Sequence, residues 1–573
     1  MGQSQIIDGV RVIWCVLLAA ITLSAGLPAV AHPPGPSRHR HLADREPNQT
    51  LNPEEEAFVH TPAGFQQAGE PRTVDSKDVA KAMLRVKVVD ADSGELTAAR
   101  VNIVGPQGNF YEPLENGLAA WSRQHTAVNE THGPSRYYGW YFYTLGQFAA
   151  QVPVGDVRIE VWKGYECQPV RRIVNVSAGE SRDLTITMER TVPMNAYGYY
   201  AGDTHIHLNR TNSYDDERAL DLMAAEDIEY GFILCMNEPS HYSGLMPRQI
   251  WPQDMGFGKS SVQTRGRYGI ASGQEYRART YGHICLLMHE RLVLEGLTIN
   301  PNEWPVFGQI GEKTRQLGGF SFHAHGGYSH EIYADYVQQL TDGVELLQMA
   351  HYRGIGLTGW YRVLNVGYRF PAVAGSDFPY CRCLGDCRNY VRTHDRPDFV
   401  DWARGAAEGR SFFTTGPFVL LDVAGHQPGD TIERQATDQT PLPVHVRLRS
   451  EVTAVQQLEL IVNGKPVKMI EVPTAKQRGQ WFEVRETISI DRPCWIAARA
   501  YSTSATGRPD AEAHTNPVYV YVDGKRPFSS EDRDWLLTKL DKRIEALQER
   551  DFPEKEQAIE YFETSRQHLL SRE

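Results

Sequence analysis

Two histidines one residue apart, His205 and His207, follow a short apolar run and are the most chemically suggestive pair in the chain. On an extended strand, side chains alternate between the two faces, so both imidazoles would point to the same side. Two neutral imidazoles at the end of a strand can bind one cation. A second His-x-His pair, His323 and His325, closes another strand-like run. The spacing therefore predicts a metal centre assembled from strand ends.

Two acidic residues end strand-like runs in the same part of the chain. Glu275 ends the run 270–275, and Asp377 ends the run 372–377. Between and beside them, His283 opens one apolar run and His351 follows another. Taken singly, such a carboxylate usually caps a helix or faces solvent, and such a histidine usually packs in a core. Taken together, imidazole and carboxylate groups suit zinc, manganese or iron better than calcium or magnesium.

The elements that must position these residues alternate between strand-like and helix-like segments from about residue 196 to residue 420. In the segment 215–226, Leu220, Met223 and Ala224 share one helical face. Alternating strands and helices are typical of parallel β/α units, and in barrels of such units the carboxyl ends of the strands converge on one face. Further helices are expected at 302–317, 330–340, 357–366 and 398–407.

Regions rich in short strands lie on both sides of this central part. Alternating apolar residues and Gly or Asp turns predict a β-sandwich-like module over residues 79–192 and another over 421–525. Residues 526–573 predict a helical hairpin, because an apolar stripe of helical period is broken at Pro553 and then resumes. The predicted fold is thus multi-domain, with a central metal-binding domain over 193–420.

The amino-terminal segment has the three parts of a secretory signal peptide. Arg11 precedes an apolar run over 12–23, and a small-x-small cleavage site follows at 29–31. Residues 1–31 therefore predict export to the periplasm or the extracellular space, with an uncleaved amino-terminal anchor as the alternative. Residues 32–78 predict a flexible linker, since they are polar and rich in proline. No later run is long enough to span a membrane, so no span is expected in the mature chain.

Charge and cysteine content limit the remaining possibilities. A formal net charge of -12 argues against nucleic acid as a partner, because nucleic acid selects basic surfaces. Cys381, Cys383 and Cys387 are closely spaced, and two interpretations stay open. Export would permit a disulfide there, whereas a second metal site would need a fourth soft ligand that is not evident nearby.

The order of the histidine and carboxylate motifs resembles that of the PHP (polymerase and histidinol phosphatase) metallohydrolases, and more narrowly that of their CehA/McbA branch, named for carbaryl hydrolase. The motifs are Gly-Asp-x-His-x-His at 202–207, Ser-Gly-x-Glu at 272–275, Gly-His at 282–283, His-Gly-Gly at 325–327 and Ala-Gly-Ser-Asp at 374–377. The segment 409–417 resembles the one that closes that branch's catalytic domain. The resemblance covers roughly residues 80 to 525. It implies a distorted (β/α)7 barrel whose metal ligands are His205, His207, Glu275, His283, His325 and Asp377.

The chain departs from the family pattern at two places. The family often has Asp-His after its second strand, where this chain has the segment 235–238, Cys-Met-Asn-Glu. The family's final aspartate is often followed by x-His, whereas Asp377 is followed by Phe378 and Pro379. Because fewer ligands remain, the sequence predicts one or two divalent ions, with zinc first and manganese or iron as alternatives.

The predicted activity is hydrolysis of an ester, amide or carbamate bond in a small-molecule substrate by a metal-activated water. Either His351 or His323 would relay protons, and Arg277 would neutralise negative charge that develops on a substrate oxygen. One alternative is a PHP-type phosphoesterase, with Arg277 and nearby arginines holding the phosphate. Another is a non-catalytic exported binding protein whose metal site has degenerated. The oligomeric state stays open.

Overall fold

The computed structural model describes residues 80–115, 118, 123–125, 139–236, 256–278, 280–293, 303–327, 331–348, 351–379, 383–452, 454–503 and 509–572. All of them belong to one compact unit, Ser37–Glu573. The predicted signal peptide at 1–31 and the predicted linker at 32–78 lie outside the described residues. Both therefore stay predictions.

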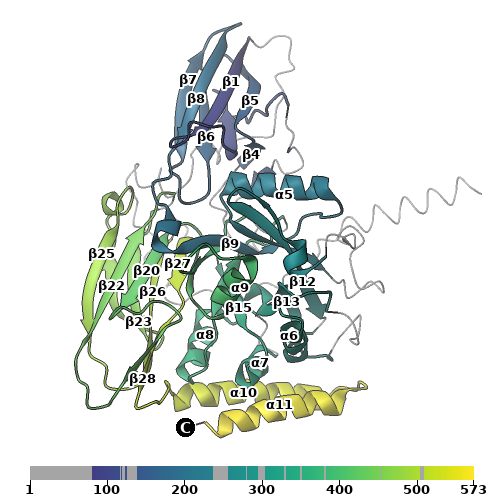
Figure 1. Ribbon diagram of the computed structural model, residues 1–573, viewed down its shortest axis with the longest axis vertical. Helices are drawn as coiled ribbons and strands as arrows, with labels where there is room; N and C mark the ends of the chain where they lie inside the picture. Colours follow the sequence, from purple (N-terminus) through teal and green to yellow (C-terminus); the bar gives the residue numbers. More distant parts are fainter. Residues whose placement is uncertain are drawn as a thin grey trace, which may run out of the picture. The chain divides into compact units, whose positions relative to one another are not determined.

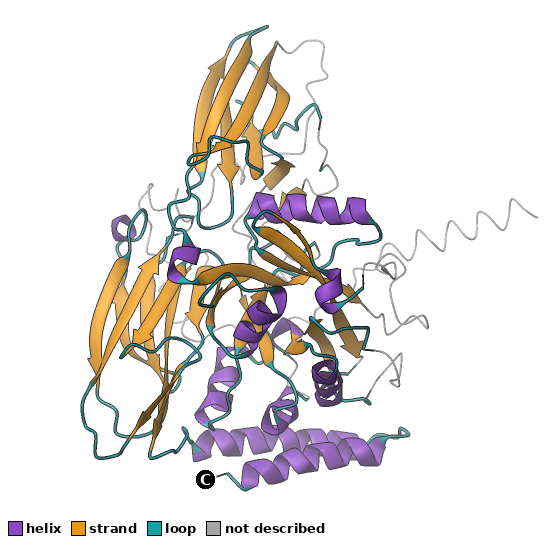
Figure 2. Cartoon of the chain, viewed as in Figure 1, coloured by secondary structure: helices purple, strands orange, loops and turns teal. Residues whose placement is uncertain are grey.

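The first module consists of two β-sheets that share one apolar core. Alternation along the first strand places Leu84, Val86 and Val88 in that core. Strands dominate this module in Figure 2. One sheet has the order β5-β1-β8 and the other the order β3-β4-β2-β6-β7. The strands are β1 (Lys81–Asp90), β2 (Ala99–Val104), β3 (Arg123–His125), β4 (Gly139–Thr144), β5 (Gln147–Pro153), β6 (Gly155–Trp162), β7 (Val170–Val176) and β8 (Ser181–Met188).

The central region forms one curled sheet with mixed strand directions, in which β18 returns to pair with β9 (Figure 1). The pairs β9–β10, β10–β12, β14–β15 and β15–β17 are parallel. The pairs β12–β13, β13–β14 and β18–β19 are antiparallel. The strands are β9 (Tyr199–Ile206), β10 (Tyr230–Met236), β11 (Gln263–Arg265), β12 (Tyr268–Ala278), β13 (Gly282–Leu287), β14 (Phe320–His323), β15 (Gly343–Gln348), β16 (His351–Tyr352), β17 (Ala372–Gly375), β18 (Arg388–Arg392) and β19 (Ser411–Thr414).

The predicted central (β/α)7 barrel is wrong, because this sheet does not repeat a strand-then-helix unit. Only residues 279–281 separate β12 from β13, and the two strands form an antiparallel pair. A parallel crossover needs about a dozen residues or more, so no helix fits into that connection. The sequence pattern misled here because Glu275 lies inside β12, which continues to Ala278, and not at the end of a shorter strand.

In the described residues of the central region, five α-helices pack around the sheet, and each overlaps a segment for which the sequence predicts a helix, which confirms those five segments. α5 begins after Asn212, whose side chain accepts a hydrogen bond from the backbone N–H of Asp215. α9 begins in the same way after Asp398, whose side chain accepts from the N–H of Asp401. The helices are α5 (Ser213–Glu226), α6 (Phe307–Gln316), α7 (Ile332–Gln338), α8 (Gly356–Asn365) and α9 (Phe399–Ala407).

The strands after the central region join its sheet through the antiparallel pair β19–β27. A separate sheet, β20-β22-β25, shares an apolar core with them. The strands are β20 (Phe418–Val423), β21 (Thr431–Arg434), β22 (Leu442–Arg449), β23 (Gln457–Val462), β24 (Lys465–Glu471), β25 (Phe482–Ile488), β26 (Cys494–Thr503), β27 (Pro509–Thr515) and β28 (Val518–Val522).

Two helices end the chain, α10 (Ser530–Gln548) and α11 (Lys555–Leu570), and they lie side by side in Figure 1. Ser529 caps α10 by accepting a hydrogen bond from the N–H of Asp532. The buried face of α10 includes Leu536, Leu540 and Ile544, which join the same apolar core as α7 and α8. Within the described part of the chain, no helix is both long and apolar enough to cross a membrane.

Candidate metal centre

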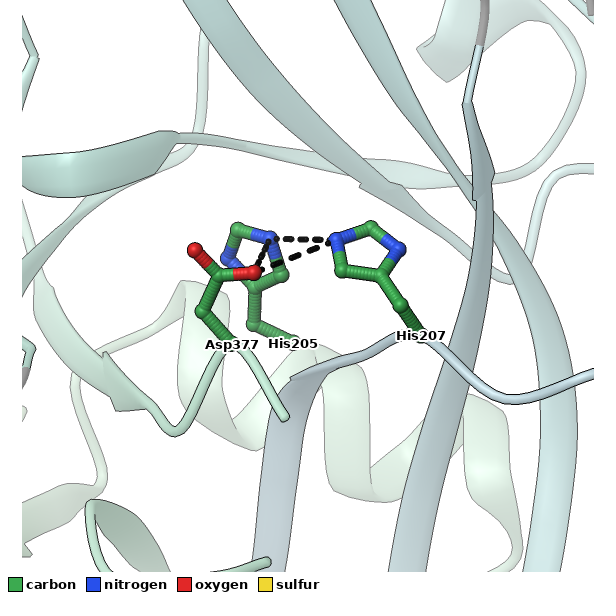
Figure 3. A group of neighbouring side chains, drawn as sticks. All are labelled: His205, His207 and Asp377. Carbon is green, nitrogen blue, oxygen red and sulfur yellow. Dashed lines mark hydrogen bonds and ion pairs between the residues drawn. The ribbon is translucent and has the colours of Figure 1, made fainter. Parts of the chain in front are cut away.

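His205 and His207 meet where β9 ends, as their spacing predicts. Both side chains are buried, and their Nε2 atoms lie 3.1 Å apart. Asp377, which follows β17, places its Oδ1 atom 3.3 Å from His207 Nε2 and 3.5 Å from His205 Nε2. Figure 3 shows the two ring nitrogens and this carboxylate oxygen pointing toward one another. We call these three residues the first ligand group.

The buried side chain of Asp203 connects the two strands that carry this group. Its Oδ1 atom accepts hydrogen bonds from the backbone N–H groups of His205 and Ser376, both at 3.1 Å. Its Oδ2 atom accepts from the N–H of Gly385 at 3.0 Å. One carboxylate therefore fixes the backbone beside His205 and beside Asp377 at once.

A second ligand group consists of His283, at the start of β13, and His325, which follows β14. His283 Nδ1 lies 3.0 Å from His325 Nε2. The Oε1 atom of Glu275, in β12, lies 2.7 Å from His283 Nδ1 and 3.3 Å from His325 Nε2. Its Oε2 atom faces the first group, 3.4 Å from His207 Nε2. Glu275 is thus placed to contribute one oxygen to each group.

The separations within the first group match those of atoms that share a metal ion. Ligand atoms bound tetrahedrally at about 2.0–2.1 Å lie about 3.3 Å from one another. The three pairs in the first group measure 3.1, 3.3 and 3.5 Å. Among the described residues, three buried groups could hold a metal ion by the proximity of their ligand atoms: His205, His207 and Asp377; His205, Glu275 and His325; and His205, Cys285 and Glu345.

The proton positions on the two imidazole rings also indicate a site for a cation. His207 Nδ1 lies 3.0 Å from the carbonyl oxygen of Leu234, which only accepts, so Nδ1 carries the proton. His205 Nδ1 lies 3.0 Å from both carboxylate oxygens of Glu345, so in this ring too Nδ1 is the donor. In neutral rings both Nε2 atoms are then bare acceptors that face each other and a carboxylate. A cation between them would satisfy all three groups.

The pKa values indicate a strongly negative local potential. Burial lowers the pKa of His205, but Cys285, Glu345 and Asp377 outweigh burial and hold it well above its usual value. Burial raises the pKa of Glu275, yet Arg277 and His283 bring it well below its usual range. Burial lowers the pKa of His283 to about 3, which leaves that ring neutral and able to bind a metal.

Two residues that contact the candidate ligands are absent from the set predicted from the sequence. Glu345, in β15, contacts His205 Nδ1 and also accepts a hydrogen bond from the backbone N–H of His325 at 2.9 Å. Gln348, three residues further on, donates to Asp377 Oδ2 at 3.1 Å. Partners of this kind fix the orientation of metal-binding side chains. The available signal was a single carboxylate inside the apolar run 343–347.

The structure brings together all six predicted ligands. The three predicted catalytic residues differ in their positions relative to these ligands. The guanidinium of Arg277 donates to Glu275 Oε2, with its Nη2 atom at 2.7 Å. His323 lies outside the two groups: its Nε2 atom is 3.0 Å from Asp335 Oδ2, and its ring packs against Phe307. The backbone of His351 forms part of β16, and its side chain lies outside the described residues.

Two of the three closely spaced cysteines are described. Cys383 and Cys387 are buried, and burial raises the pKa of the Cys383 thiol well above its usual value. In the part of the chain that the structure describes, neither belongs to a group of candidate metal ligands. Cys381 lies outside the described residues, so the disulfide interpretation stays untested.

Comparisons with known proteins add little. No protein-family profile matches the chain. No curated protein matches it either. The solved structures with some similarity include the minor pilin GBS52 of Streptococcus agalactiae, at 12% identity and a TM-score of 0.14, and the phospholipase PlaB of Legionella pneumophila, at 11% identity and a TM-score of 0.12. These matches cover 20% and 21% of this chain, and 45% and 27% of those proteins.

Proposed function

We propose that the protein is an exported, metal-dependent hydrolase that cleaves an ester, amide or carbamate bond in a small molecule. The observation that carries this proposal is the convergence of imidazole nitrogens and carboxylate oxygens in two groups that share Glu275. The order of these ligands along the chain is the one that resembles the PHP metallohydrolases.

The ligand set favours two ions. His205, His207 and Asp377 would hold one, His283 and His325 would hold the other, and Glu275 would contact both. Mixed imidazole and carboxylate ligands suit zinc best, with manganese or iron as alternatives. When bound, such ions lower the pKa of water and polarise a substrate oxygen.

The remaining residues of the centre act by orientation and charge. Glu345 and the carbonyl of Leu234 contact the Nδ1 atoms of His205 and His207 and so turn both Nε2 atoms toward the ligand groups. Arg277 lies at the edge of the centre, with 11% of its side chain exposed. From there its guanidinium would donate hydrogen bonds to a substrate oxygen on which negative charge develops.

The same arginine favours one second candidate, phosphoester hydrolysis. A planar guanidinium beside a pair of metal sites can donate hydrogen bonds to two oxygens of a phosphate group at once. Parallel assays on carboxyl esters, amides, carbamates and phosphoesters separate the two candidates.

The test is metal analysis of the purified full-length protein, followed by turnover on that substrate panel. We expect up to two zinc, manganese or iron ions per chain, loss of turnover with a chelator, and recovery when metal is restored. His205→Ala should lose both metal and turnover. His445→Ala, at a histidine paired with Glu483 in the C-terminal strands, is the matched control and should lose neither. Turnover that persists in metal-free protein, or wild-type protein that binds no metal, would refute the proposal.

A further inference from the structure

The two helices of the C-terminal hairpin each contact a segment that carries a ligand of the second group. From α10, the buried Arg543 forms an ion pair with Glu303 and donates a hydrogen bond from Nη2 to the hydroxyl of Tyr281 at 3.3 Å. The Tyr281 hydroxyl in turn donates to the carbonyl oxygen of Glu303 at 2.9 Å. Tyr281 lies two residues before His283, so Arg543 holds the turn that leads into this ligand.

From α11, the hydroxyl of Tyr561 donates to Oδ1 of Asp335, a fully buried carboxylate in α7. The Oδ2 atom of Asp335 lies 3.0 Å from His323 Nε2. His323 ends β14 two residues before His325, so this second chain of contacts leads to the other histidine of the second group.

Further contacts fix α7 against α11. Gln338 donates from Nε2 to the hydroxyl of Ser565 at 2.8 Å and to the carbonyl oxygen of Tyr561 at 3.0 Å. Ser565 donates to the carbonyl oxygen of Ala334 at 3.2 Å. The link therefore consists of several hydrogen bonds between two rigid helices, and it is not a single surface contact.

The first ligand group is held in another way. His205 and Asp377 are connected through Asp203 and through the strands β9 and β17. The hairpin does reach the segment before β17, where Arg362 and Asn365 of α8 bond to Asp532. Those contacts lie at least seven residues before β17 begins at Ala372, whereas the links to the second group end two residues from each histidine.

From this asymmetry we infer that the C-terminal hairpin positions His283 and His325 and so controls occupancy of the second ligand group, while the first group assembles without it. Arg543 and Tyr561 are the positioning residues. The inference rests on the proposed metal centre. It assigns a part in binding one of the two ions to residues that lie 236 to 260 positions away from these histidines in the sequence.

The test uses the full chain with Arg543→Met and Tyr561→Phe, singly and together. Metal content per chain is measured under chelator competition, and cobalt is titrated as a spectroscopic probe. In the double variant we expect metal content to fall from two ions to one, with the second ion bound about 10–100-fold more weakly, as when orienting partners of ligands are removed. The cobalt spectrum of the first ion should stay unchanged. Arg543→Lys, which keeps a cation beside Glu303, should partly restore the second ion.

Arg566→Met is the matched control, because Arg566 pairs with Asp541 between the two helices and does not contact the ligand-bearing segments. Thermal unfolding monitored by circular dichroism shows whether each variant is folded. If the double variant is unfolded, the metal content of the two single variants tests the inference instead. Retention of both ions with wild-type affinity in folded variants, or equal loss of both, would overturn the inference, as would a wild-type protein with one ion. Wild-type protein without any metal would instead refute the proposed function.

Discussion

Buried charges gather in two regions of this molecule, and they are satisfied in opposite ways. Where the first β-module meets α5, Arg100 Nε donates to Glu226 Oε1 at 2.7 Å, and the hydroxyl of Tyr143 donates to the same oxygen at 2.6 Å. Nearby, Arg190 bonds to both oxygens of Asp227 at 2.6 and 2.7 Å. We call this region the junction cluster. Its acids face donors that the chain itself supplies.

In the candidate metal centre, ring nitrogens and carboxylate oxygens crowd together. His205 Nε2 lies 3.1 Å from His207 Nε2 and 3.5 Å from a carboxylate oxygen of Asp377, while the protons of both rings are used on their other sides. Taking charges out of water is costly in both regions; the junction cluster offsets that cost with Arg100 and Arg190, whereas in the candidate metal centre Arg277 pairs with Glu275 and several imidazoles crowd around the same carboxylates. Burial of charge is therefore not in itself a sign of function. The sign is a set of imidazole nitrogens and carboxylate oxygens that approach one another as closely as the ligands of one ion do.

The largest effect is expected from removing the carboxylate that both ligand groups share. Glu275→Gln keeps the shape of the side chain but loses its negative charge and one of its two acceptor oxygens. We expect metal affinity of both groups to fall by more than about 100-fold, which exceeds the loss typical of indirect contacts. Turnover should fall with it. Metal analysis and substrate assays measure the two effects, and an unchanged metal content would contradict the shared role of Glu275.

The corresponding change in the junction cluster should affect stability and leave metal binding alone. Arg100→Met removes the guanidinium and leaves Glu226 buried beside Tyr143. Breaking a buried pair in this way costs about 3–5 kcal/mol of unfolding free energy. Urea unfolding measures that loss, while metal content per folded chain should equal that of the wild type. A variant as stable as the wild type would show that Arg100 does not compensate the buried charge of Glu226.

The sequence predicted which side chains lie together better than it predicted the fold. The six candidate ligands could be found because each stands in a short motif beside an apolar run, and the structure brings all six together. The order of strands could not be found in this way. A strand followed by a tight turn and a second strand has the same local pattern as a strand followed by a loop, so the β12–β13 hairpin gave no signal against a barrel.

The side-chain directions of the two His-x-His pairs also differ for a local reason. His205 and His207 point to one side, as expected of positions i and i+2. His323 and His325 do not, because the extended backbone ends at His323 and His325 adopts a left-handed conformation with φ of 56°. The period of 2 no longer holds beyond the strand. Sequence spacing alone does not reveal where a strand stops, and for this reason His323 was predicted at the centre and instead lies beside Asp335.

The junction cluster should also give the protein a distinctive pH dependence. Arg190 contacts two acids, and it donates two hydrogen bonds to one of them, Asp227. The pKa of Asp227 therefore falls well below the usual range despite burial. Burial raises the pKa of the other acid, Glu166, to about 7. Between its unfolded value of about 4.5 and about 7, Glu166 is protonated in the folded chain and ionised in the unfolded one. The unfolding free energy should therefore decrease as pH rises through this window, by up to roughly 3 kcal/mol.

Glu166→Gln removes that titration and keeps an acceptor for the backbone N–H of Met194. We expect the wild type to lose more unfolding free energy than the variant when the pH rises from 4.5 to 7.5. Urea unfolding at four or five pH values measures this difference. Parallel pH curves would contradict the assignment.

A smaller effect is expected from Glu345, which touches one ligand of each group without binding metal in the proposed arrangement. Glu345→Gln keeps an oxygen for the His325 backbone N–H but loses the charge that fixes the proton on His205 Nδ1. Both ions should bind about 10–100-fold more weakly, while the fold is kept. Glu512→Gln is the matched control, since Glu512 is equally buried and pairs with Arg499 in the C-terminal strands. If both variants bind metal as the wild type does, Glu345 is an ordinary buried acid like those of the junction cluster. If only Glu345→Gln binds metal more weakly, its charge serves the ligands, and the contrast between the two regions extends to the residues around the centre.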